Sequence, residues 1–556
     1  MLDSRPLSRR LGACLAIFAL VAAACGSSTA TPTTAPGTAA PTGAAIATGT
    51  VGASPAGTPD NTPRGGTINI INGSDGVSWD PTTTQGTYPG SPMDPLAAAY
   101  GFLVYTDING QVVGSMAKSL TTTDGITWTL KLRGDAVKFT DGTPYDAEAV
   151  KYNWDRAADP ATAAPTQKWV ATWNTGMTVV DSTTLTIKLP QADSVFAYEV
   201  AALCPFIASP TALRAAAKKT DIKPVGAGAF TLVSWDQGVK TVMKRNPNYW
   251  DQPRPYLDEL DFTIIAQTNS RIATVVQGGA TMMAGYPYQF GTNNKADGVT
   301  MAKVAIRGIN FAYFNATKGI FADLRARQAF YAAIDPVQLL AAYTQSDLPQ
   351  PATSYFGAAS PLTDPSLKLP KYDPAKAQSL IDALAADGKA FKVDIVSDNN
   401  SDNKRFGDYL AQALNAYKGV TATVTQMDQS LTPARCKTQL DFDICYMGGV
   451  SVFNGPEPLT TNLFAPGGTQ NFGRYSSPTM DAALAAAKAA GTAATQKAAY
   501  VTVQQTLYQD LPIYLFGEQF RYLLLRNNTG GLVPSNQGIL QSQYLYVCPS
   551  QCLPSV

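Results

Sequence analysis

Apolar and polar residues alternate along this chain in short stretches that predict strands, and segments with a helical period lie between them. The segment Ile126–Arg133 carries apolar side chains at every second position, as a half-buried strand does: Trp128, Leu130 and Leu132. Further on, Val150 and Trp154 lie four residues apart on one face of a predicted helix, and Asp146 precedes them where a helix cap is expected. Stretches of both kinds follow one another along the chain, which predicts an α/β fold.

Two further strands are predicted around the turn Asp236-Gln237-Gly238. A glycine-rich turn at 226–228 leads into the first strand, 229–235, and the second strand covers 239–244. The triplet Asn246-Pro247-Asn248 then ends the hairpin, because proline lacks a backbone donor and holds the residue before it in an extended or turn conformation. Periodicity alone makes this a structural hairpin.

Four stretches of the chain follow the order of motifs in a known protein family. They are the strand-turn-helix segment Val137–Trp154, the hairpin segment Pro224–Trp250, the strand Asn310–Asn315 and the helix Leu324–Asp335. Together they resemble family 5 of the bacterial extracellular solute-binding proteins, the peptide-, nickel- and oligosaccharide-binding partners of ABC importers. The resemblance covers residues 64 to 530 or so.

The resemblance implies a two-lobed α/β fold of the periplasmic-binding-protein type (type II, large peptide-binding class), with an extra subdomain in the first lobe. Length agrees, because 556 residues exceed what one compact core holds. The parts implied for this sequence are a lobe 1 core at 64–100, 222–308 and 511–556, an extra subdomain at 101–221, and lobe 2 at 309–510. We therefore predict that the chain crosses between the lobes at two hinges, near Gly308-Ile309 and near Asp510-Leu511.

The first 24 residues have the pattern of an export signal. Three arginines precede the apolar stretch Leu11–Ala24, which is too short to span a bilayer. The small residues before Cys25 resemble a lipobox, so we expect residues 1–24 to be a lipoprotein signal peptide and Cys25 to carry the lipid. An ordinary signal peptide cleaved nearby is the alternative.

Residues 25–63 are expected to form a tether. They consist mainly of Thr, Ala, Pro and Gly, with almost no large apolar side chain, and cannot bury enough surface to offset the entropy of ordering. A tether after a lipidated cysteine predicts an extracytoplasmic protein, anchored by its lipid at the outer face of the cell membrane or in the periplasm.

The composition excludes several classes of protein and of catalytic or metal site. The formal net charge is +1 and only 15% of the residues are charged, which argues against a nucleic-acid binder. There is no histidine, so Ser-His-Asp and Cys-His sites are excluded, as is any metal site that needs imidazole. A carboxylate pair of the glycosidase kind is not excluded. We expect no cofactor, no metal and a monomer.

The cysteines beyond the export signal favour two short disulfides. In an exported protein close pairs are plausible bridges, so we expect Cys436–Cys445 and Cys548–Cys552, with Cys204 as a buried thiol. Spacing alone does not fix this connectivity. A zinc site is disfavoured, because no pair has tight C-x2-C spacing.

The stretch Asp441–Pro458 bears on the ligand. In peptide-binding relatives it carries a Trp and then an Asp that pairs with the α-amine of the ligand, whereas this chain has Gly448-Gly449-Val450-Ser451 there. A primary amine would therefore need another counter-charge to offset its desolvation, and an uncharged or sugar-like ligand competes with a peptide. The predicted ligand contacts are Tyr88, Tyr100, Trp235, Tyr446, Gly448, Gly449, Phe453 and Asn454. For each single aromatic residue, packing in a core is an equal alternative.

The favoured hypothesis is a lipid-anchored solute-binding protein that delivers a small molecule to the permease subunits of an ABC importer and is not an enzyme. Its ligand is expected to be peptide-like or oligosaccharide-like. One alternative is an exported hydrolase such as a glycosidase, which needs two acids roughly 5–10 Å apart in the cleft. The acids near the expected cleft are Asp441, Asp443 and Glu457. Another alternative is a ligand-loaded sensor on the same fold.

Overall fold

The computed structural model describes the body of the chain, residues 61–552, except residues 77, 84–92, 108–109, 286–289, 291–295, 347, 359, 400, 429–430, 447–448, 452–455, 534 and 536–537. The predicted signal peptide, Cys25 and almost all of the predicted tether lie outside the described residues. Within the described part of the chain, no helix combines the length and the apolar content needed to cross a bilayer.

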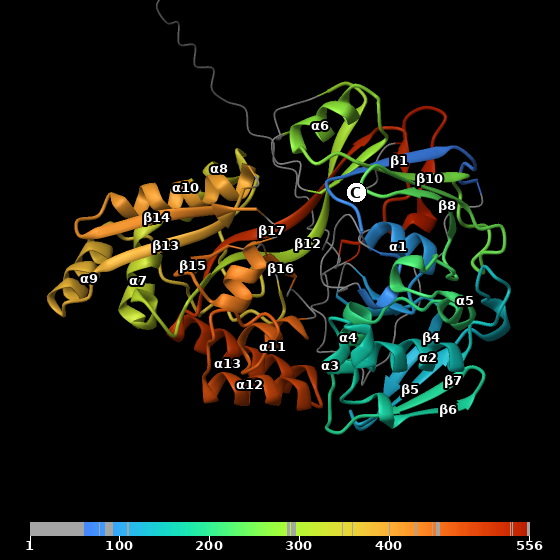
Figure 1. The fold of residues 1–556 in the computed structure, drawn as a ribbon, viewed down its shortest axis with the longest axis horizontal. Helices are drawn as coiled ribbons and strands as arrows, with labels where there is room; N and C mark the ends of the chain where they lie inside the picture. The colour runs from blue at the N-terminus through green and yellow to red at the C-terminus, as the bar shows by residue number, and fades with distance from the viewer. Residues whose placement is uncertain are drawn as a thin grey trace, which may run out of the picture. The chain divides into compact units, whose positions relative to one another are not determined.

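One sheet of eleven strands runs through both lobes (Figure 1). Its order is β14 (Val420–Met427), β13 (Phe391–Asp398), β15 (Ile444–Cys445), β12 (Val299–Phe314), β17 (Ile513–Arg526), β11 (Met282–Gly285), β1 (Thr67–Asn72), β10 (Glu259–Ile264), β9 (Lys240–Arg245) and β8 (Phe230–Asp236), with β16 (Gly449–Ser451) paired to β12. Strands β12 and β17 are the longest, and they pair antiparallel from Val299–Arg526 to Tyr313–Ile513.

The apolar cores divide this sheet into two lobes along β12 and β17. On the lobe 1 side, Ala302 and Leu523 join the core around β1 and β10. On the lobe 2 side, Phe314 and Phe516 join the core formed with the helices around β13. Each long strand therefore begins in one core and ends in the other, which makes the pair the physical link between the lobes.

The two predicted hinges differ in how close they lie to the points where the chain passes between the lobe cores. Gly308-Ile309 lies within β12, next to an irregularity in the pairing between Val304 and Gly308. The second crossing lies further along the chain than Asp510-Leu511, because Leu511 to Phe516 still pack in the lobe 2 cores and Leu523 is the first residue in the lobe 1 core. Leu511 ends the preceding helix in a left-handed conformation with φ +49°.

The expected extra subdomain is a four-stranded antiparallel sheet with the order β4 (Ala117–Thr122), β5 (Thr127–Leu132), β7 (Thr184–Lys188) and β6 (Met177–Asp181). Strand β5 is the one predicted from alternation, and Trp128 on it is fully buried. Helix α2 (Ala147–Ala158) begins as predicted, with Asp146 accepting a hydrogen bond from the Ala149 amide at 2.8 Å. The subdomain shares one continuous apolar core with the rest of lobe 1.

The described part of lobe 1 contains five more short helices and two small strand pairs. The helices are α1 (Met93–Tyr100), α3 (Gln167–Val170), α4 (Phe196–Leu203) and α5 (Pro210–Ala215), with α6 (Thr268–Val276) on the other face of the sheet. The strand pairs are β2 (Val104–Thr106) with β3 (Val112–Gly114), and β18 (Thr529–Gly530) with β19 (Tyr546–Val547).

Lobe 2 is richer in helices. They are α7 (Leu324–Ala333), α8 (Pro336–Thr344), α9 (Pro374–Ala386), α10 (Ser401–Asn415), α11 (Leu459–Phe464), α12 (Pro478–Ala489) and α13 (Ala493–Asp510). Five of them start at a side chain that accepts a backbone amide of the first turn: Asp323, Asp335, Asp373, Ser477 and Thr492. Local sequence therefore sets where these helices begin.

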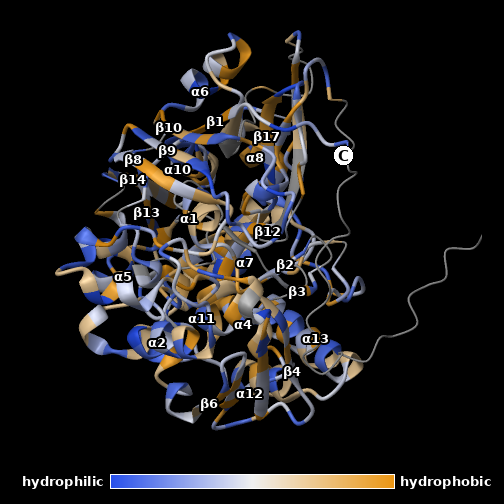
Figure 2. Ribbon diagram, turned by 90° about the vertical axis from the view of Figure 1, so that its right-hand side faces the viewer, coloured by the Kyte–Doolittle hydropathy of each residue, from blue (hydrophilic) through white to orange (hydrophobic). Residues whose placement is uncertain are grey.

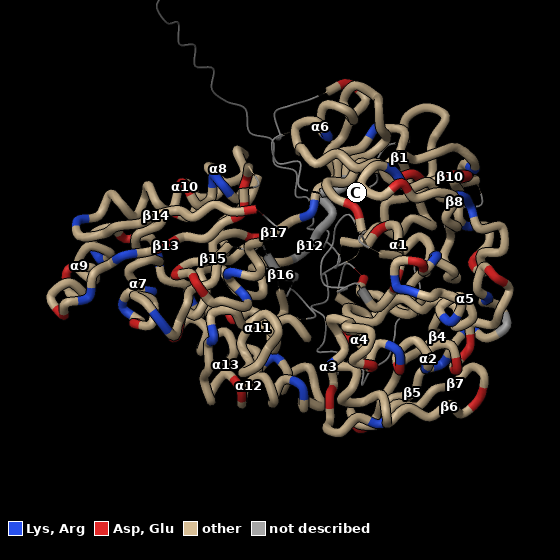
Figure 3. Tube along the Cα trace, in the orientation of Figure 1, with Lys and Arg blue, Asp and Glu red and all other residues tan. Residues whose placement is uncertain are grey.

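Hydropathy and charge are distributed as these layers require. Figure 2 shows hydrophobic and hydrophilic positions mixed along α7 and hydrophilic positions along α2. Lys and Arg are interspersed with Asp and Glu over both lobes in Figure 3, in keeping with the net charge of +1.

The predicted hairpin forms from β8 and β9, and its glycine-rich entry has a steric reason. A Cβ atom on Gly226 would lie 2.3 Å from the Ala99 carbonyl oxygen and 2.4 Å from the Tyr100 Cα, so only glycine lets this turn approach the end of α1. The turn before the hairpin thus lies directly against the end of α1.

The structure pairs the cysteines in the way expected from the sequence. Cys436 is bonded to Cys445 in lobe 2, and Cys548 is bonded to Cys552 near the end of the described chain. Cys204 is a buried free thiol, and burial raises its pKa to about 12. Such a thiol stays protonated and inert at neutral pH.

Candidate binding site at the lobe junction

Strand β12 lies between β16 and β17 where the lobes meet. Gly308 pairs with Ser451 on one side and with Gln519 on the other, and Asn310 pairs with Gly449 two residues further on. Residues Gly449–Ser451, which belong to the stretch expected to differ from peptide-binding relatives, therefore form strand β16 at the junction. Gly449 is a predicted ligand residue that the structure places there.

Four other predicted ligand residues lie outside the described residues: Tyr88, Gly448, Phe453 and Asn454. Their contact with a ligand stays a prediction.

Two predicted aromatic residues have the environment of core residues. Tyr446 is 2% exposed, its hydroxyl lies 2.8 Å from that of Tyr343, and its ring is 4.4 Å from that of Phe406. The Tyr446 amide donates to the Val396 carbonyl, which extends the sheet and accompanies packing of the ring within the lobe 2 core. Tyr100 has no exposed surface and lies in the lobe 1 core. In this structure both residues pack in a core, which is the alternative to ligand contact that the sequence left open.

Trp235 lies at the far edge of the sheet from the junction. It is on β8, and four strands separate β8 from β17. The Trp235 indole nitrogen donates to an Asp75 carboxylate oxygen at 2.7 Å, and its ring meets Trp79 edge to face at 5.9 Å. The structure thus gives Trp235 partners within lobe 1 and does not bring it together with Gly449.

A buried ion pair connects α1 with the junction strand β17. The Arg521 Nη2 atom lies 2.9 Å from the Asp94 Oδ2 atom, and the two side chains are 2% and 1% exposed. The other carboxylate oxygen of Asp94 accepts the Leu540 amide at 2.9 Å. Both oxygens of Asp94 are therefore engaged, and the pair fixes the start of α1 against β17.

A second buried charge cluster joins the lobes where α12 meets α4 (Figure 1). The Lys488 ammonium of lobe 2 lies 2.6 Å from Glu199 and 3.3 Å from Asp193, both in lobe 1. The Ser194 amide also donates to the Lys488 carbonyl at 2.8 Å. Glu199 is 1% exposed, and its second oxygen accepts the indole N–H of Trp169 at 2.9 Å.

Carboxylates outnumber cations in this cluster. Glu457 is 2% exposed and interacts electrostatically with Lys488, so three acids share one ammonium. Burial and the charge of Asp193 raise the pKa of Glu199 to about 8, although Lys488 acts in the opposite direction. Burial also raises the pKa of Glu457. Burial alone lowers the pKa of Lys488, but the carboxylates around it outweigh that effect and raise it. Both shifts favour the protonated form of the two glutamates.

The three acids considered for a hydrolase have separate structural partners. Asp441 is exposed and lies 3.4 Å from Arg435. Asp443 accepts the Asp394 amide at 2.8 Å. Glu457 is buried and accepts the Thr461 amide at 3.2 Å. These contacts are those of residues that hold loops and helix starts in place.

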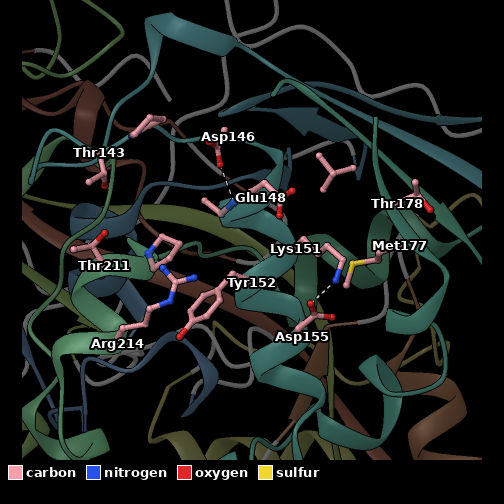
Figure 4. A pocket seen from close by; sticks show the side chains of 14 residues that line it. Thr143, Asp146, Glu148, Lys151, Tyr152, Asp155, Met177, Thr178, Thr211 and Arg214 are labelled. Atoms are coloured by element: carbon pink, nitrogen blue, oxygen red, sulfur yellow. Dashed lines mark hydrogen bonds and ion pairs between the residues drawn. The ribbon is translucent and has the colours of Figure 1, made fainter. Parts of the chain in front are cut away.

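A pocket of about 680 Å³ lies beside α2 in the subdomain (Figure 4). Two of its wall contacts involve charged groups: Lys151 pairs with Asp155 at 2.5 Å, and the Arg214 guanidinium lies over the Tyr152 ring at 4.4 Å. None of the predicted ligand residues lines this pocket. It is a feature of the subdomain surface and not of the junction.

Sequence reasoning missed both buried charge sites. Asp94 and Arg521 are 427 residues apart, and Lys488 and Glu199 are 289 residues apart. No local spacing joins such residues.

Comparison with known proteins agrees with this architecture. A sequence model of the bacterial extracellular solute-binding proteins, family 5, middle part, matches residues 111–471. The glutathione-binding protein GsiB of Shigella flexneri is 29% identical over 447 residues, which cover 76% of this chain and 84% of that protein.

Solved structures share the fold. The periplasmic binding protein DppA of Helicobacter pylori, in complex with the peptide STSA, superposes with a TM-score of 0.76 at 20% identity, over 87% of this chain and 98% of that one. The oligopeptide-binding protein AppA of Bacillus subtilis, in complex with a nonapeptide, gives a TM-score of 0.75 at 18% identity, over 88% and 100%. The fold is thus the two-lobed type II periplasmic-binding-protein fold.

Proposed function

The chain belongs to family 5 of the bacterial extracellular solute-binding proteins, and from this premise we propose that it captures a small solute between its lobes and delivers it to an ABC import permease. Members of the family are solute-binding components of importers and not enzymes. The observation that carries the proposal is the strand pair β12–β17. It links two lobes with separate cores, and strand β16 pairs with β12 at their junction.

The solute is of the peptide or oligosaccharide type. A relative binds glutathione, and two structural neighbours hold peptides, which supports a peptide-like ligand. Against a free α-amine stands the sequence of β16 and its approach, where Gly448 to Ser451 offer no carboxylate. Of our eight predicted contacts, Gly449 is a described residue at the junction, and Tyr88, Gly448, Phe453 and Asn454 lie outside the described residues. The other three, Tyr100, Trp235 and Tyr446, pack against the core of one lobe.

The N-terminal region supports attachment to a membrane surface. Cys25 follows a short apolar stretch and precedes a polar segment rich in Thr, Ala and Pro, so we propose a lipid on Cys25 and a tether up to residue 63. Intact-mass measurement of protein from its membrane fraction tests this: a Cys25→Ala variant loses the added lipid mass and leaves the membrane fraction. Retention of that variant in the membrane contradicts the anchor.

The hydrolase alternative has less support. A glycosidase needs two carboxylic groups facing the same sugar. Asp441, Asp443 and Glu457 are instead held by Arg435, Asp394 and Thr461. A sensor role uses the same capture step and differs only in the membrane partner.

Native mass spectrometry of the purified protein tests the capture step. We expect one solute bound per chain, and calorimetry with peptides and oligosaccharides then identifies its class. Turnover of the solute with none retained in a stoichiometric complex contradicts the proposal. Binding of a free-amine dipeptide at micromolar affinity contradicts only the argument from the missing carboxylate.

A further inference from the structure

Arg521 is buried at the junction with donors to spare. Its Nη2 atom pairs with Asp94, but its Nε and Nη1 atoms are buried and have no hydrogen-bond partner among the described residues. A guanidinium carries five N–H groups, and buried polar groups in folded proteins are almost always paired. Leaving one unmade costs about 1–3 kcal/mol. The described residues therefore leave two nitrogen atoms of this arginine without an acceptor.

Two other buried arginines show what a structural arginine looks like in this protein. Arg254 also leaves Nε and Nη1 without partners, but its guanidinium lies over the Tyr544 ring at 4.6 Å and pairs with Asp251 beside it. Arg271 binds two backbone carbonyls and Thr268 within its own loop. Arg254 thus has an ion pair and an aromatic ring as partners, and Arg271 is held within its own loop. The hydrogen bond and ion pair of the Arg521 guanidinium with described residues are those with Asp94 alone.

The position of Arg521 connects its open donors with the solute site. It pairs with Val304 on β12, and Gln519, two residues before it, shares a row with Gly308 and Ser451. Arg521 therefore lies two residues along β17 from the row that reaches the end of β16, and the irregularity in the β12–β17 pairing falls between them. Strand β16 carries the predicted ligand residue Gly449.

The charge balance decides which acceptor fits. Asp94 already neutralises Arg521, and its carboxylate lies 2.9 Å away. A second carboxylate would add an uncompensated negative charge next to Asp94 in a buried site, where like charges repel strongly. A neutral oxygen atom satisfies the open N–H groups without that cost.

We propose that Arg521 donates hydrogen bonds to an uncharged oxygen of the captured solute, an amide carbonyl or a sugar hydroxyl, while Asp94 neutralises and orients its guanidinium. This inference rests on the proposed function and narrows its solute class. At the junction the solute is neutral: a blocked or internal peptide segment, or an oligosaccharide.

A set of five probes of matched size tests the proposal by calorimetry on the wild-type protein. Four are forms of trialanine: blocked at both ends, free at the carboxyl end only, free at the amino end only, and free at both. Maltotriose is the fifth, and it separates a hydroxyl source from an amide source. We expect blocked trialanine or maltotriose to bind at least tenfold more tightly than trialanine with a free carboxylate.

The variant Arg521→Lys then connects that preference with the side chain. Lysine keeps the positive charge opposite Asp94, so the fold survives, but it lacks the guanidinium fork and its remaining donors. We expect the affinity for the preferred neutral probe to fall by about tenfold, which corresponds to roughly 1.4 kcal/mol. Arg254→Lys is the matched control. It changes a buried arginine that also has two nitrogens without partners but lies outside the junction. We expect this variant to bind the probe with wild-type affinity.

The outcomes are distinct. A tenfold preference for the free carboxylate overturns this inference and leaves the proposed function intact. Unchanged affinity in Arg521→Lys also overturns it, and shows that ordered water alone meets the open donors. If the wild-type protein binds none of the probes and carries no solute by native mass spectrometry, the proposed function fails and this inference fails with it.

Discussion

At the strand junction one arginine faces one carboxylate, whereas at the contact between α12 and α4 one lysine faces three. The Asp94–Arg521 pair is balanced in charge, yet two nitrogens of the arginine have no acceptor. The Lys488 cluster is the reverse: Glu199 has partners for both oxygens, yet the charges do not balance.

The comparison separates two requirements that are often treated as one. A buried ionic group must have its charge compensated and its hydrogen bonds made, and either can fail alone. Where hydrogen-bond donors are in excess, a neutral acceptor completes the site, and a solute provides one. Where carboxylates are in excess, a proton completes the site, and solvent provides it. The first site therefore bears on specificity and the second on pH dependence.

The largest effect is expected from breaking the balanced pair. Arg521→Met leaves the Asp94 carboxylate buried without a counter-charge, which costs about 3–5 kcal/mol of unfolding free energy. Urea unfolding measures the loss. In the double variant Asp94→Asn with Arg521→Met no buried charge remains, and we expect part of the stability to return. Equal stability of the single and double variants would mean that Asp94 is not charged in the folded protein.

Removing Lys488 tests the carboxylate excess. Lys488→Met leaves three acids without a cation, and we expect a loss of about 3 kcal/mol at pH 8. Protonation relieves this repulsion, so the loss becomes smaller at pH 5. Unfolding curves at the two pH values decide the matter: a loss that does not depend on pH contradicts an excess of carboxylates at this contact.

A smaller effect is expected from Glu199 in the wild-type protein. Its pKa is about 8 in the folded state against an ordinary value of 4.5, so the folded protein binds the proton more tightly. The stabilisation is fully present below pH 4.5 and is lost as the pH rises through about 8. Glu199→Gln keeps an oxygen for Trp169 but cannot ionise, and we expect it to flatten the decline of stability between pH 5 and 8.

The matched control for that measurement is Glu148→Gln, which changes an exposed glutamate in α2. Its pH profile should follow the wild type. A Glu199→Gln profile that also follows the wild type contradicts our assignment of the proton to this residue.

Local features of the fold follow from neighbouring residues and could be predicted. Strand β5 has the alternation of Trp128, Leu130 and Leu132, and Asp146 caps α2 as its position suggests. The turn at Gly226 precedes the hairpin because its backbone approaches α1 too closely for a side chain. Each of these features depends on contacts within one motif or, at Gly226, on the absence of a Cβ atom.

The candidate site depends on contacts that no local pattern records. Tyr446 occupies a promising position in the sequence, but its amide continues the sheet beside Val396 and its ring packs in the lobe 2 core. The second hinge was expected at Asp510-Leu511, where a helix ends before a proline. β17 starts only two residues later and carries the chain on through the lobe 2 core, so the crossing comes further along. Tertiary packing decided both cases.

The smallest effect is expected for an exposed ion pair, which serves as the reference for the two buried sites. Lys404 and Asp408 on α10 form an ion pair at 2.8 Å, as short as the buried ones, but their side chains are 52% and 49% exposed. Exposed pairs four residues apart on a helix contribute about 0.3–0.5 kcal/mol, because water compensates each charge when the partner is lost. Lys404→Met should therefore change the unfolding free energy, measured by urea unfolding, by no more than about 0.5 kcal/mol. A loss comparable to that of Lys488→Met would show that pairing itself, and not burial, sets the size of these effects, and the contrast between the two buried sites would then lose its physical basis.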